Sequence, residues 1–134
     1  RFVINGCEWA SVEHCFQAAK FPDNAALKER IRTAYSGGDA HALANTTCAA
    51  VLRHDWERVK VQVMYEANVA KFMQNAQLRL VLTSSRGPIT AFGFSFWAKW
   101  NAVLLERIRE ELRADGERDE TVLAAKVAAM EAYA

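Results

Sequence analysis

One short stretch, residues 11–21 (SVEHCFQAAKF), places a carboxylate, an amide and an amine at regular spacing. It contains no proline or glycine and opens with Ser11, which can cap a helix, so we predict three turns of α-helix. At 100° per residue, Glu13, Gln17 and Lys20 then fall within about 60° of one another on one face. Such groups can transfer protons, orient a ligand and attack an electrophile.

A second stripe on the same predicted helix is apolar and can anchor it in a core. It consists of Val12, Phe16 and Ala19. The polar face has two interpretations at this point, because it can line a reactive site or simply be solvated, as charged helix faces usually are. His14 lies about 100° around the helix from Glu13, which favours a structural histidine over one that contacts a ligand.

Capping and turn residues divide the rest of the chain into helices. Asn5-Gly6 after the β-prone residues 2–4 predicts a short strand or hairpin. Pro22 ends the first helix. Later helices are expected to begin at caps. These caps are Asp23, Asp55 (for the longest helix, to about Met73), Asn75 and Asp119.

Glycines and short loops complete the predicted pattern. Gly37-Gly38 should stop the second helix, and residues 39–52 should form two short helices with a break. A loop at residues 84–88, a weak strand at residues 89–94 and a helix from Trp97 or Asn101 to Arg113 follow. The expected fold class is mainly α: a single multihelical domain over residues 1–134, with a short N-terminal strand or hairpin.

Composition limits the partners and the compartment. The formal net charge of +1 gives no overall attraction to nucleic acid, so local groups must hold any phosphate. No apolar run approaches the ~20 residues that span a bilayer. Cys7, Cys15 and Cys48 lack metal-site spacing and are expected to be buried free thiols, which favours an intracellular, cytoplasmic protein. The chain opens inside a predicted strand, so we expect a trimmed N-terminus.

Three blocks of sequence carry a family likeness. They are residues 2–6 (FVING) with 9–14 (WASVEH) and 16–21 (FQAAKF), residues 53–60 (RHDWERVK), and residues 97–101 (WAKWN). In this order they resemble the motifs of the NADAR family, the YbiA-like N-glycosidases, and the first block is the most specific. The resemblance implies a YbiA-like fold and cleavage of an N-glycosidic bond at a ribose anomeric carbon.

The resemblance also implies roles for the first block. Glu13 would act as acid and then as base beside the anomeric carbon. Lys20 would attack the ring-opened sugar to form a Schiff base or, alternatively, hold a substrate phosphate by its charge alone. Gln17 would orient a ribose hydroxyl or a phosphate, and His14 joins the candidate substrate-binding residues.

The other two blocks would supply the walls of a pocket. Trp56 and Trp97 match stacking positions of the family, with core packing as the alternative role for each. Arg53 is placed to bind a pyrophosphate beside Trp56. Asn101 would bond the ribose or cap the helix that follows it.

Two departures from the family pattern bear on the substrate. Asn45-Thr46 stands where members commonly have Gly-Arg, and residues 92–97 (FGFSFW) replace a segment with a carboxylate and Trp-Gly-x-Gly. The pocket wall is then more aromatic and less charged. This favours ADP-ribosylated guanine in nucleic acid as the substrate.

The expected function is therefore an N-glycosidase of the ADP-ribosyl glycohydrolase type. We expect a monomer without cofactor, metal or membrane partner. One alternative is an N-glycosidase that acts on phosphorylated ribosylamino-pyrimidine intermediates of riboflavin synthesis. Another is a non-catalytic ADP-ribose-binding module, which could dispense with Glu13 and Lys20.

Overall fold

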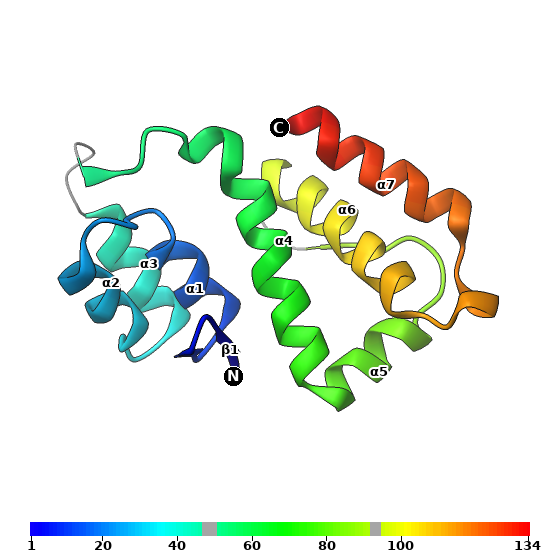
Figure 1. Cartoon of the computed structure of the whole chain (residues 1–134), viewed down its shortest axis with the longest axis horizontal. Helices are drawn as coiled ribbons and strands as arrows, with labels where there is room; N and C mark the ends of the chain where they lie inside the picture. Colours follow the sequence, from blue (N-terminus) through cyan, green and yellow to red (C-terminus); the bar gives the residue numbers. More distant parts are fainter. Residues whose placement is uncertain (47–50, 92–94) are drawn as a thin grey trace. The chain divides into compact units, whose positions relative to one another are not determined.

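The computed structural model describes residues 1–46, 51–91 and 95–134, and most of them are helical, as the sequence predicts (Figure 1). These residues form two units, Arg1–Gln74 and Asn75–Ala134. No helix in the described ranges is long and apolar enough to cross a membrane. The single domain expected over the whole chain stays a prediction.

A hairpin begins the N-terminal unit. β1 (Phe2–Ile4) pairs antiparallel with β2 (Cys7–Trp9). Asn5 and Gly6 connect them with φ angles of 50° and 78°, and positive values at both positions are what a type I′ turn requires. The hairpin alternative of the prediction is therefore confirmed.

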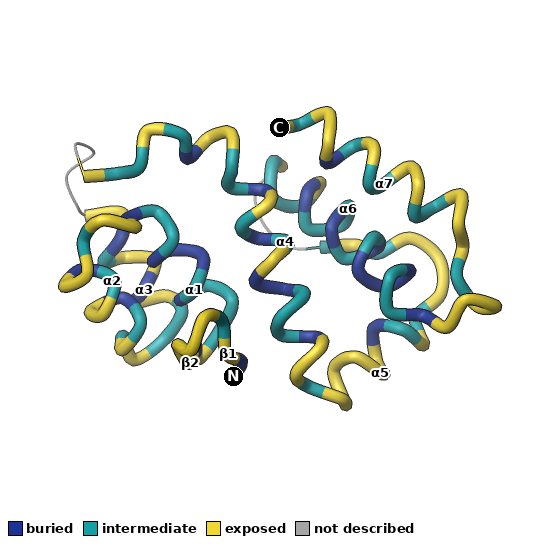
Figure 2. The backbone as a smooth tube through the Cα atoms, in the orientation of Figure 1, coloured by how far each residue is buried: buried dark blue, intermediate teal, exposed yellow. Residues whose placement is uncertain are grey.

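Four helices of this unit lie in the described residues. They are α1 (Val12–Ala18), α2 (Ala25–Arg32), α3 (Gly37–Asn45) and α4 (Trp56–Gln74). α1 packs against the other three and against β2, so it lies at the centre of the unit. Buried residues are dark blue along the backbone in Figure 2. The buried apolar residues that form the core of this unit include Phe2, Trp9, Phe21, Leu27, Ile31 and Ala67. Residues on α1 are therefore held from several sides.

The edge of β1 is bonded by a side chain. The Oε1 of Gln74 accepts the backbone N–H of Val3 at 2.7 Å, and its Nε2 donates to the Val3 carbonyl at 2.8 Å. The side-chain amide of Gln74 therefore pairs with the backbone N–H and C=O of Val3 as a neighbouring strand would, and these two groups of the strand edge have hydrogen-bond partners.

Two helix starts differ from the predicted ones. Asn24, not Asp23, caps α2, because its Oδ1 accepts a hydrogen bond from the N–H of Leu27 at 3.1 Å. Gly37 and Gly38 begin α3 instead of ending α2. Ser36 caps α3, because its hydroxyl accepts a hydrogen bond from the N–H of Asp39 in the first turn at 3.1 Å. The second short helix predicted within residues 39–52 falls partly on residues 47–50, outside the described residues.

The C-terminal unit is helical as well. It contains α5 (Ala76–Ser84), α6 (Ser95–Leu112), a short 3-10 turn η2 (Asp115–Glu117) and α7 (Glu120–Tyr133). α6 packs against both α5 and α7, and Asp119 caps α7 as predicted. The strand predicted at residues 89–94 is absent from residues 89–91, where the N–H of Ile89 donates to Glu106 on α6 at 3.0 Å. Its remainder lies outside the described residues.

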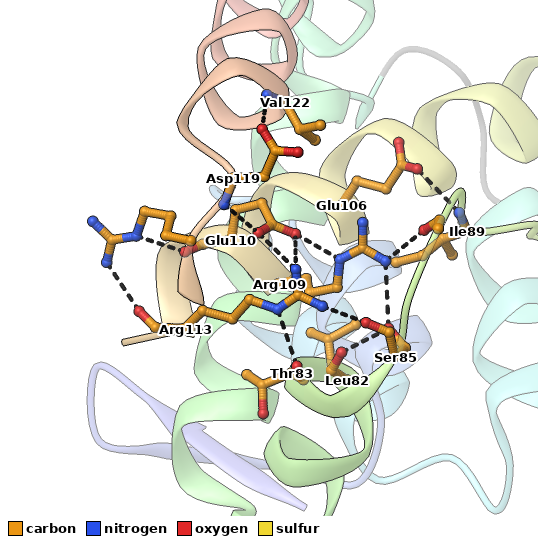
Figure 3. Close-up of polar contacts among 12 residues, drawn as sticks. Leu82, Thr83, Ser85, Ile89, Glu106, Arg109, Glu110, Arg113, Asp119 and Val122 are labelled. Carbon is orange, nitrogen blue, oxygen red and sulfur yellow. Dashed lines mark hydrogen bonds and ion pairs between the residues drawn. The ribbon is translucent and has the colours of Figure 1, made fainter. Parts of the chain in front are cut away.

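The carboxylate of Glu110 is fully buried in this unit, and Figure 3 shows the donors that surround it. Glu110 accepts hydrogen bonds from Arg109 at 2.7 Å, from Arg113 at 2.8 Å and from the N–H of Asp119 at 2.9 Å. Burial raises the pKa of Glu110, but these donors outweigh it and hold that pKa below its usual range. Both guanidinium groups also donate to backbone carbonyls within residues 83–87. The buried cluster of Arg109, Glu110 and Arg113 on α6 thus forms hydrogen bonds both to residues 83–87 and to the start of α7.

Candidate active site

On the predicted polar face, the carboxylate of Glu13 is hydrogen-bonded to the side-chain amide of Gln17. Gln17 donates from Nε2 to Oε1 of Glu13 at 2.6 Å, one helical turn away on α1. Gln17 is only 2% exposed, whereas Glu13 is half-buried. The Oε1 of Gln17 is buried without a hydrogen-bond partner in the described part of the chain. Gln17 thus holds Glu13 in the structure, and its expected contact with a ribose hydroxyl or a phosphate stays a prediction.

The lysine of the predicted face lies beyond the helix, so the predicted third turn is wrong. α1 ends at Ala18, and the N–H groups of Lys20 and Phe21 donate three residues back instead of four. Phe21 precedes Pro22, and the residue before a proline avoids the α conformation. The carbonyl of Lys20 instead accepts the N–H of Arg53 at 2.9 Å.

Lys20 is half-buried above two aromatic rings. Its Nζ lies 5.9 Å from the ring centroid of Phe16 and 5.8 Å from that of Trp56. It forms no ion pair within the described ranges. Burial lowers the pKa of Lys20, while the charges of Glu13 and Glu57 partly counteract this effect. The amine is therefore neutral more often than that of a solvated lysine.

Trp56 lies beneath this lysine and is almost wholly buried, with 6% exposed. Its ring packs on Phe16 at a centroid distance of 4.9 Å and an interplanar angle of 58°. This environment fits the alternative role of core packing, and stacking on a ligand stays a prediction. Arg53 pairs with Asp55 at 2.6 and 2.9 Å and lines a cavity of about 390 Å³ with Pro22.

His14 is 2% exposed and has protein partners at both ring nitrogens. Nε2 lies 3.0 Å from the carbonyl of Ala34, and because a carbonyl only accepts, Nε2 carries the proton. Nδ1 lies 2.7 Å from the hydroxyl of Ser11, which donates to it. These contacts favour a structural histidine that joins α1 to the segment before α3.

One neighbour of Glu13, the start of α3, was not predicted from the sequence. A Cβ placed on Gly37 would lie 3.2 Å from Cβ of Glu13 and 3.6 Å from Oγ of Ser11, so α3 begins directly against α1. The available signal was Ser36 with Asp39 three residues later, a pattern that marks a helix start. A glycine pair equally marks the end of a helix, and that prediction is wrong here.

Two predicted wall residues belong to the C-terminal unit. Trp97 lies in the first turn of α6 and meets Phe96 edge-to-face, with ring centroids 5.0 Å apart. Asn101 lies inside α6, so the capping alternative is wrong. The substrate contacts expected of Trp97 and Asn101 stay predictions.

The thiols differ from one another. Cys7 is exposed on the hairpin, so the prediction of a buried thiol is wrong there, because β2 turns this residue to solvent. Cys15 is half-buried, and burial raises its pKa to about 11. Cys48 lies outside the described residues.

Comparison with known proteins gives a consistent picture. The sequence pattern described as the NADAR domain matches residues 1–89. N-glycosidase Npun_R5314 of Nostoc punctiforme is 42% identical over 81 residues, which cover 59% of this chain and 51% of that protein. N-glycosidase YbiA of Escherichia coli (strain K12) is 40% identical over 82 residues, covering 61% and 50% respectively. The chain thus spans about half the length of these curated relatives.

Two further likenesses extend the comparison. The NMR structure of E. coli YbiA superposes with a TM-score of 0.73 at 31% identity, covering 83% of this chain and 71% of that one. The mainly helical fold class is therefore confirmed. Riboflavin biosynthesis protein VVA0006 of Vibrio vulnificus is 36% identical over 76 residues, which cover 57% of this chain but 20% of that protein.

Proposed function

Because the chain belongs to the NADAR family, we propose that it is an N-glycosidase that removes ADP-ribose from guanine in nucleic acid. The observation that carries this proposal is the group around Glu13. A carboxylate held by Gln17 lies within electrostatic range of a half-buried lysine. A non-catalytic binding module would need neither residue.

Glu13 handles the protons of the reaction. Its Oε1 is occupied by the amide of Gln17, which leaves Oε2 to exchange protons with the substrate. As an acid it protonates the departing base nitrogen, and as a base it then deprotonates the attacking water. One carboxyl group can perform both steps because the first leaves it ionised for the second.

Lys20 supplies a covalent route. When the ribose ring opens, its ring oxygen takes a proton and C1 stays joined to the base nitrogen as an iminium. Nζ of neutral Lys20 adds to C1, and the base nitrogen leaves with its electron pair and a proton, so that an imine joins C1 to Nζ. Water then adds to C1, Nζ departs, and ADP-ribose is free. The lowered pKa of Lys20 raises the neutral fraction that this attack needs.

A second candidate is an N-glycosidase of phosphorylated ribosylamino-pyrimidines. The likeness to the Vibrio riboflavin biosynthesis protein favours it. The aromatic character of residues 92–97 favours the larger ADP-ribosyl substrate.

Two substrates test the proposal directly. The chain is incubated with a DNA oligonucleotide that carries ADP-ribosylated guanine and, separately, with a ribosylamino-pyrimidine phosphate, and mass spectrometry follows both. We expect free ADP-ribose and an unmodified oligonucleotide from the first. Cleavage of the pyrimidine alone would replace the proposal by the second candidate, and binding without cleavage of either would favour the module.

Glu13→Gln should lower the rate of ADP-ribose release by about 10²-fold or more, the scale of general acid–base groups, with little loss of binding. The substituted amide keeps the shape and can still accept from Gln17, but it cannot exchange a proton. Single-turnover kinetics and calorimetric titration with ADP-ribose measure the two effects. Glu131→Gln, an exposed change in α7, is the control. Near-normal turnover by Glu13→Gln would exclude Glu13 as the proton-transfer group.

A further inference from the structure

The first residue of α3 lies so close to α1 that a side chain at this position would require its neighbour to move by a few tenths of an ångström. A Cβ on Gly37 would lie 3.2 Å from Cβ and 3.5 Å from Cγ of Glu13. A Cβ on Gly38, the next residue, would lie 3.7 Å from Oγ of Ser36, an ordinary contact, and within 4 Å of no other atom of the described residues. Neither glycine has a positive φ, so backbone conformation does not explain the choice at either position. At Gly37 the explanation is the close approach.

Hydrogen bonds hold the segment before α3 close to α1. His14 bonds the carbonyl of Ala34 at 3.0 Å, three residues before Gly37, and Ser11 bonds His14 at 2.7 Å. The segment that leads into α3 is therefore tied to the start of α1. Movement of α3 to make room for a bulkier residue at position 37 would strain these bonds.

Two neighbours therefore bear on the side chain of Glu13. Gln17 donates a hydrogen bond to its carboxylate from one turn along the helix, and the start of α3 leaves little room for further atoms beside its Cβ and Cγ. We propose that Gly37 is a positioning residue for Glu13, setting the direction in which its carboxylate projects. The inference rests on the proposed function for its effect on rate, but its geometric content is independent of that function. Misplacement of a reacting group by a fraction of an ångström lowers the rate without weakening binding to the same degree.

Gly37→Ala and Gly38→Ala form a matched pair, since both exchange glycine for alanine in the first turn of one helix. We expect Gly37→Ala to lower kcat about tenfold or more with KM changed less than about twofold, because the carboxylate is displaced while the ligand contacts remain. Gly38→Ala should keep the rate of the unmodified chain. A purely structural role would instead change the melting temperature and leave kcat of the folded fraction intact.

A second measurement does not depend on activity. The side-chain amide of Gln17 reports on Glu13, and its ¹H–¹⁵N resonances should shift in Gly37→Ala but not in Gly38→Ala. Where Gly37→Ala lowers the melting temperature, the loss should shrink in a Glu13→Gly background, which removes the two carbon atoms that the new methyl group meets.

The outcomes separate the two ideas. If the unmodified chain cleaves no N-glycoside, the proposed function fails, and the Gln17 resonances still decide the role of Gly37. If the chain is active and the two alanine variants agree in kcat and in the Gln17 resonances, the positioning role is overturned and the proposed function stands.

Discussion

Lys20→Arg should reduce release of ADP-ribose from guanine by about 10³-fold or more, since removal of a covalent nucleophile can cost up to about 10⁶-fold in kcat. Arginine keeps the positive charge and can still lie over the rings of Phe16 and Trp56. A guanidinium stays protonated and cannot add to C1 of the sugar. If the charge alone were needed, the substitution would be mild.

Borohydride gives the direct evidence for this step. Added during turnover, it reduces the imine and leaves ADP-ribose attached to the peptide that contains Lys20, visible as a mass increase. Lys28→Arg, at another half-buried lysine of the same unit, is the control and should still give the adduct. Normal turnover by Lys20→Arg together with no trapped adduct would leave Lys20 as a phosphate-binding charge and water as the nucleophile.

Glu110→Gln should destabilise the C-terminal unit by about 3–5 kcal/mol, the range measured when one partner of a buried ion pair is removed. Arg109 and Arg113 have side chains only 5% and 6% exposed, so both cations would lose their buried counter-charge. Hydrogen exchange at the amides of α6 and α7 measures the loss locally. Glu117→Gln, exposed in the same unit, should change little.

The same carboxylate predicts the direction of acid sensitivity. The pKa of Glu110 is lower in the folded chain than in the unfolded one, so its contribution is fully present above the unfolded value of about 4.3. The contribution is lost as the pH falls through the lower folded value. Protection of the α6 and α7 amides from hydrogen exchange should therefore decrease as the pH falls below about 4.3 in the unmodified chain. The decrease should be less steep in Glu110→Gln. Parallel acid profiles for the two proteins would contradict this assignment.

Local interactions were the part of the site that the sequence could predict. Glu13 and Gln17 are four residues apart on a helix that Ser11 caps, so their hydrogen bond depends only on helix geometry. Lys20 was misplaced because the restriction imposed by Pro22 acts one residue earlier than the proline itself. The amine of Lys20 still lies within electrostatic range of Glu13. A turn after the end of α1 brings it there, instead of a third helical turn.

Contacts between distant segments could not be predicted in this way. Gly37 is 24 residues from Glu13, and a glycine pair ends helices as readily as it permits close approach. Glu110 stands in a charged stretch, ERIREELR, which has the composition of a solvated helix face. Only the packing of the loop before α6 and the start of α7 makes it a buried anion.

The two hydrogen bonds between Gln74 and Val3 join residues 71 positions apart, at the two ends of the N-terminal unit. Fraying of the last turn of α4 would therefore free two polar backbone groups at the edge of β1. The end of α4 and the hairpin should then lose protection from hydrogen exchange together rather than one after the other.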